Sequence, residues 1–165
     1  MSVETPDNNH SLKVGLSFGL TSGVITTLGL MVGIYSSTKS ELAVIGGILT
    51  IAIADSMSDA LGIHVAEESE NIHTPLEIWI STLTTFFAKF LVSCTFLIPV
   101  FLLTLERAIE ISIFWGIALL SVYNYYIAKK QKVNPLLVVG EHVFIAILVI
   151  VITHFLGQWI NQHFS

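Results

Sequence analysis

Charge is scarce in this sequence, and the little it has is not basic. Charged residues make up 12% of the 165 residues and apolar residues 53%, whereas a typical soluble domain has roughly 25% charged residues. Such a composition cannot cover a water-soluble globule with a charged shell. Lys and Arg total 7 against 12 Asp and Glu, so no basic surface is available to neutralise phosphates, and we expect no nucleic-acid partner.

Cysteine and enzyme motifs are also scarce. Cys94 is the single cysteine and lies in an apolar run, which excludes a disulfide framework and a Cys-based zinc or iron–sulfur site. The sequence has no His-Glu-x-x-His motif for zinc hydrolysis and no Gly-x-x-x-x-Gly-Lys motif for nucleotide. We therefore expect a protein that is not an enzyme and holds no cofactor.

What the chain does have is long apolar runs. A helix needs about 20 residues to cross the hydrocarbon of a bilayer, and the polar breaks divide this chain into segments of that length. The sequence predicts an all-α integral membrane protein, a single domain over residues 12–160 between a polar tail at 1–11 and a short tail at 161–165. The five predicted spans are about 12–35, 42–66, 76–103, 108–128 and 136–160.

The connections predict the orientation of these spans, because cytoplasmic loops carry the excess of Lys and Arg. Lys13 and the lysines of 129–132 fall on one side, a total of four, whereas Lys39 and Arg107 fall on the other. The sequence therefore predicts the N-terminus in the cytoplasm and the C-terminus outside. We expect the cell membrane as the location, with a vacuolar or other internal membrane as the alternative.

Three charged residues lie where charge is expensive. Asp55 and Asp59 are four residues apart in the second span and so share a face, and Lys89 lies at a similar depth in the third. Each costs at least about 2.5 kcal/mol at the centre of a bilayer, which makes such residues functional candidates by default. Paired carboxylates favour a cation site or a proton path. The alternative is that they form a structural clasp with Lys89, in a membrane protein that assembles but does not transport.

Small residues repeat along one face of the first span at spacings of three and four. Because such residues let helices approach closely in lipid, we expect this face to be a packing or dimer surface, and the partners to be the bilayer and a second copy of the chain. The face comprises Gly15, Gly19, Ser22, Thr26, Gly29 and Gly33.

Three stretches are similar to the vacuolar iron transporter family. They are Gly19-Leu-Thr-Ser-Gly-Val-Ile-Thr-Thr-Leu-Gly-Leu30, Ala54-Asp-Ser-Met-Ser-Asp-Ala-Leu-Gly62 with the acidic exit at 66–70, and Asn134-Pro135 with Thr153-His-Phe-Leu-Gly157. The resemblance implies a dimer of five-span subunits that transports divalent metal, and we expect protons to be exchanged for it. This chain resembles a short, diverged member, since only residues 67–75 stand where many members insert a cytoplasmic metal-binding domain.

The resemblance also implies which residues bind the ion. Asp55 matches a retained family aspartate, while Ser22 stands at a family aspartate and Asp59 at a metal-contacting methionine. We expect Asp55 and Asp59 as ligands with Ser22 and Thr26 across the pathway, and a proton exchanged at these carboxylates or at Lys89. Oxygen ligands suit Fe²⁺ or Mn²⁺ more than Cu or Zn. The residues expected to gather cations at the cytoplasmic mouth are Glu67, Glu68 and Glu70.

Overall fold

The computed structural model describes residues 8–164, and this part of the chain is helical throughout apart from short connections. It has five helical segments that are long and apolar enough to cross a membrane. This confirms the predicted number of long apolar helices. Their elements are α1 (Asn8–Thr38), α2 (Glu41–Thr50), the π-helical η1 (Ile51–Asp55), α3 (Ser56–Glu70), α4 (Pro75–Thr95), α5 (Leu97–Leu102), α6 (Leu105–Gln131) and α7 (Pro135–Phe164).

Four of the five helical segments extend past both ends of their predicted spans, because local capping, not hydropathy, sets where they end. Asn71 and Lys132 adopt left-handed backbone conformations, with φ of 54° and 60°, and end α3 and α6. Thr74 begins α4 with a capping box to Glu77, and Pro75 follows at the first helical position. α1 begins at Asn8, so the tail predicted for 1–11 is helical from there; residues 1–7 and 165 lie outside the described residues.

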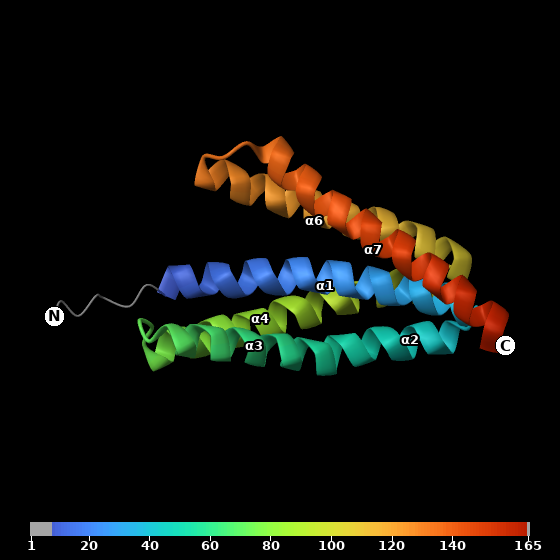
Figure 1. Ribbon diagram of the computed structural model, residues 1–165, viewed down its shortest axis with the longest axis horizontal. Helices are drawn as coiled ribbons and strands as arrows, with labels where there is room; N and C mark the ends of the chain where they lie inside the picture. The colour runs from blue at the N-terminus through green and yellow to red at the C-terminus, as the bar shows by residue number, and fades with distance from the viewer. Residues whose placement is uncertain (1–7, 165) are drawn as a thin grey trace.

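α1 is the central helix of the bundle (Figure 1). It packs against α4 along one side and against α7 along another, with α2 and α6 also in contact. The two described ends of the chain lie at opposite ends of the molecule, as five crossings require (Figure 1). The buried apolar core is built around α1 by side chains that include Val24, Leu28, Met31, Ile48, Phe96 and Leu120.

Glycines of the small-residue face permit the close approach of α1 to α4. A Cβ at Gly15 would lie 2.5 Å from the Ser81 carbonyl oxygen, and one at Gly19 would lie 2.5 Å from that of Thr85. Further along, Gly29 and Gly33 face Val149 and Thr153 of α7. This face therefore packs within the chain, and its use in a dimer stays a prediction.

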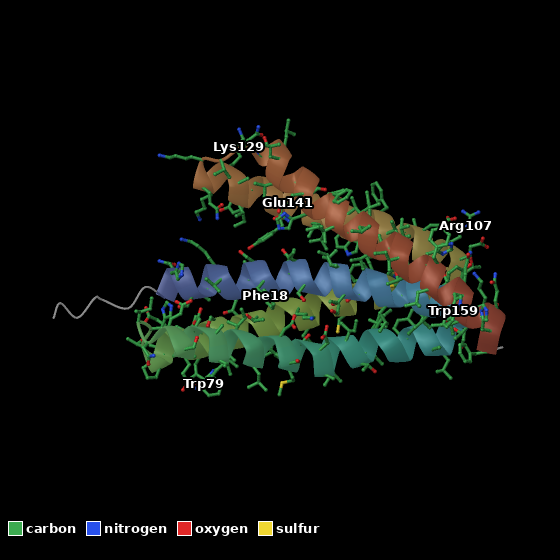
Figure 2. All side chains as sticks on the ribbon, in the orientation of Figure 1. Phe18, Trp79, Arg107, Lys129, Glu141 and Trp159 are labelled. Atoms are coloured by element: carbon green, nitrogen blue, oxygen red, sulfur yellow. The ribbon has the colours of Figure 1, made fainter. Side chains whose placement is uncertain are left out.

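Large apolar side chains cover the outside of the bundle, as contact with lipid requires. On α7, Phe144 and Phe155 are more than 60% exposed. Trp79 near the start of α4 and Trp159 near the end of α7 lie toward opposite ends of the molecule (Figure 2), where aromatic rings favour a membrane interface. The described chain is thus suited to a bilayer on its outer surface.

Candidate functional site

The site is built where α1, the second span and α4 meet. Lys89 of α4 places its Nζ 2.5 Å from Oδ2 of Asp55 and 2.6 Å from Oδ2 of Asp59. Ser22 of α1 completes the group: it accepts a hydrogen bond of 3.0 Å from Lys89 Nζ and donates one of 2.6 Å to Asp59 Oδ2. We call these four residues the lysine–aspartate cluster.

The local backbone explains how the cluster fits between the helices. A π-helical turn over residues 51–55 ends at Asp55, and the Ser56 hydroxyl donates to the Ile51 carbonyl five residues back. Such turns are rare and frequently occur at functional sites. On the other side, a Cβ at Gly23 would lie 3.3 Å from the Lys89 Cα, so this glycine lets α1 pass close to the lysine.

Burial differs sharply among the charged members of the cluster. The Lys89 side chain is fully buried, whereas that of Asp59 is 20% exposed and that of Asp55 is 38% exposed. An ammonium without water must be paired, because an isolated buried charge is very costly. Here one positive charge meets two negative ones, so with all three ionised the cluster keeps an excess negative charge.

Asp55 connects the cluster to open space. It lines a cavity of about 620 Å³ between α1, η1 and α7, together with the hydroxyl side chains of Thr26, Thr50, Ser58 and Thr153. Thr26 lines this cavity, and its hydroxyl donates to the Ser22 carbonyl at 2.8 Å. A cation that enters the cavity would therefore meet Asp55 before the rest of the cluster.

The three glutamates that were expected to gather cations at the cytoplasmic end of the pathway do not lie together. Glu68 is exposed, and Glu70 pairs with His73 at 3.2 Å. Glu67 is buried and accepts a hydrogen bond of 2.5 Å from Ser81 of α4. It lies two helical turns beyond Asp59, a distance of about 12 Å along the axis, and so does not join the cluster. Within residues 8–164, no three His, Cys, Asp or Glu side chains are close enough together to hold a metal ion.

Ser81→Ala is expected to destabilise the protein by about 1–3 kcal/mol, because it removes a donor from the buried Glu67 carboxylate. Unfolding by denaturant in detergent micelles would measure the change. Ser69→Ala is the control: Ser69 is exposed and its hydroxyl bonds only the nearby Ala66 carbonyl, so its effect should stay within about 0.5 kcal/mol. Equal effects would mean that the bond to Glu67 does not stabilise the fold.

A buried polar face on α4 leads to and past Lys89. Ser81, Thr85, Lys89 and Ser93 repeat every four residues and are all fully buried. Ser93 accepts a hydrogen bond of 3.0 Å from Thr27 of α1. Thr82, next to Ser81 in the sequence, turns toward His64 instead, whose Nδ1 lies 3.0 Å from the Thr82 hydroxyl. Ser81 and Thr27 were missed, although the spacing of four from Thr85 could have revealed Ser81.

Comparisons with known proteins add no identity to this geometry. No protein-family model matches the sequence. No curated protein matches it either. The likeness to vacuolar iron transporters therefore stays a resemblance of short sequence stretches.

Proposed function

We propose that this protein carries divalent cations across a membrane in exchange for protons, with Asp55 and Asp59 as the ion site and Fe²⁺ or Mn²⁺ as the favoured cargo. The observation that carries the proposal is the pairing of two carboxylates with one buried ammonium at 2.5 and 2.6 Å, while Asp55 also lines an open cavity. The two carboxylates thus already bind a positive charge, which is the ammonium of the protein's own Lys89.

Exchange follows from competition for the two carboxylates. A divalent ion bound by Asp55 and Asp59 would lie next to the Lys89 ammonium, and like charges at such distances repel strongly in a buried site. Release of the Lys89 proton removes that repulsion. One ion enters as one proton leaves, and the cluster changes from one excess negative charge to neutral. Ser22, which bonds both Lys89 and Asp59, supplies an oxygen between them.

The sequence resemblance supports the remaining features of the proposal. Asp55 stands at a retained family aspartate, and the five long apolar helices agree with the family's number of spans. We extend the proposal to a homodimer, with the N-terminus in the cytoplasm and the cell membrane as location. Oxygen ligands from Asp and Ser favour Fe²⁺ and Mn²⁺ over softer ions.

Asp59→Asn is expected to abolish cation uptake while leaving the protein folded. The change removes one of the two charges that would bind the ion, but retains a side-chain oxygen that can accept from Ser22. Uptake of Fe²⁺, Mn²⁺, Zn²⁺ and Ca²⁺ into proteoliposomes, with internal pH followed by a dye, measures both transport and exchange. Glu110→Gln, an equal loss of charge on the exposed side of α6, should transport normally. Unchanged uptake by Asp59→Asn would refute the assigned site.

A structural role for the cluster is the second candidate function. The complete burial of Lys89 and its two ion pairs are what a clasp between the second span and α4 would require. In that case the protein would serve membrane assembly without transport. Proteoliposomes that take up none of the four ions, made from folded wild-type protein, would favour this reading.

A further inference from the structure

A second polar cavity lies apart from the lysine–aspartate cluster and shares no lining residue with the first. It is open to the outside, has a volume of about 420 Å³, and lies between the first half of α1, the end of α6 and the start of α7. At this end of the molecule the α6–α7 pair diverges from α1 (Figure 1). We call this space the wedge cavity. Its polar lining is formed by Ser17, Thr21, Tyr123, Asn124, Gln131 and His142.

The polar groups of the wedge cavity suit a neutral ligand surface rich in oxygen. The Ser17 and Tyr123 hydroxyls are 2.8 Å apart, so only one donates to the other and one proton stays free. His142 Nδ1 lies 2.9 Å from the Val138 carbonyl, and because a carbonyl can only accept, Nδ1 is the donor in that bond. None of the six polar side chains is a carboxylate or an amine.

Three lysines lie at the end of α6, where Gln131 lines the same cavity. Gln131 belongs to the lining, and Lys130 and Lys132 flank it in the sequence with Lys129 one residue earlier. Figure 2 shows Lys129 at the end of α6 beside the loop to α7. All three lysines are exposed. In the described part of the chain none of them forms an ion pair, and the single carboxylate from residue 111 to residue 164 is Glu141, next to the lining residue His142.

We propose that the wedge cavity binds an anionic phospholipid. The lysines would hold the phosphate headgroup, and the hydroxyl and amide groups would meet the glycerol and ester oxygens. The acyl chains would continue along the apolar side chains of the cavity wall, which include Phe18 and Val138. Leu136 and Leu137, both more than 70% exposed beside the mouth, suit contact with the bilayer. Basic pockets between spans commonly recognise anionic headgroups.

The test measures lipid binding to purified, delipidated protein in a mild detergent. Native mass spectrometry and thermal unfolding would compare phosphatidylglycerol with phosphatidylcholine of the same acyl chains. We expect phosphatidylglycerol to be retained and to raise the unfolding temperature. The double variant Lys129→Gln/Lys130→Gln should bind it about thirtyfold more weakly, since two headgroup contacts are lost. The control variant Lys39→Gln/Arg107→Gln also loses two positive charges, but at positions that do not adjoin this cavity. It should bind phosphatidylglycerol normally.

Cavity-filling variants separate the cavity from the outer surface. The single variants Thr21→Phe and Val138→Phe each place a large side chain in the cavity, from α1 and from α7, and leave every lysine in place. A variant whose unfolding temperature without lipid equals that of the wild-type protein should no longer bind phosphatidylglycerol. Retention by that variant would overturn the proposal, as would equal binding of phosphatidylcholine or equal loss in the Lys39/Arg107 variant. An equal thermal shift from inorganic phosphate alone would also overturn it, because the ligand would then be a free anion.

Discussion

Lys89→Met is expected to lower the stability of the protein by about 3 kcal/mol or more, the usual cost of breaking a buried ion pair from one side. Met fills nearly the same space but leaves Asp55 and Asp59 facing each other without the ammonium that lies 2.5 and 2.6 Å from them. Denaturant unfolding in detergent micelles measures the loss. Lys130→Met, at an exposed lysine of α6, should change stability by no more than about 0.5 kcal/mol.

A second substitution shows whether the loss is electrostatic. Lys89→Met/Asp59→Asn removes one charge of each sign, so the cluster returns to a single excess negative charge, and much of the lost stability should return. No recovery would mean that Lys89 stabilises the bundle through packing alone. Among variants that stay folded, any cation uptake that remains after Lys89→Met should no longer release a proton per ion, if Lys89 is the exchanging group. Full stability together with unchanged proton release would contradict both roles of Lys89.

The residues of the cluster could be predicted from sequence because burying a charge is so costly in a membrane. That cost singled out Asp55, Asp59 and Lys89, and the i, i+4 spacing placed both carboxylates on one face. The π-helical turn that ends at Asp55 could not be predicted, since its five-residue hydrogen bonds depend on how η1 packs against its neighbours. The cavity beside Asp55 likewise arises from α1 and α7, which are far apart in the sequence.

Glu67 shows where reasoning from local sequence fails. It stands in a run of acidic residues, which is typical of a solvated loop, so the sequence groups it with Glu68 and Glu70. The structure buries it instead, because α3 continues as a helix to Glu70 and packs Glu67 against Ser81 of α4. The partner lies on another helix, and no spacing within the acidic run encodes it.

The small-residue face of α1 was predictable as a contact surface but its partner was not. Periodicity identifies which residues share a side of the helix, and it says nothing of whether the opposing helix belongs to the same chain. In the structure the first half of the face meets α4 and the second half meets α7. A consequence of this placement is that the close approach of α1 to α4 also sets the position of Ser22 relative to Lys89.

Gly19→Ala is accordingly expected to destabilise the protein by about 3 kcal/mol, at the upper end of the usual cost of overpacking. The added Cβ would lie 2.5 Å from the Thr85 carbonyl oxygen and 2.9 Å from the Ala88 Cβ. Since the nearer of these atoms is a backbone oxygen, rotation of a side chain cannot relieve the contact. The two helices must separate instead. Separation would also lengthen the 3.0 Å contact between Ser22 and Lys89, so cation uptake should fall in whatever fraction stays folded.

Glycines in open positions provide the matched controls for this change. A Cβ at Gly62 or Gly140 would have no neighbour within 4 Å, and alanine is the better helix former by about 1 kcal/mol. Gly62→Ala and Gly140→Ala should therefore leave stability unchanged or raise it slightly, which thermal unfolding in the same detergent would detect. If Gly19→Ala proves as stable as these two variants, the close packing of α1 on α4 does not hold the cluster together, and Ser22 must be positioned by other contacts.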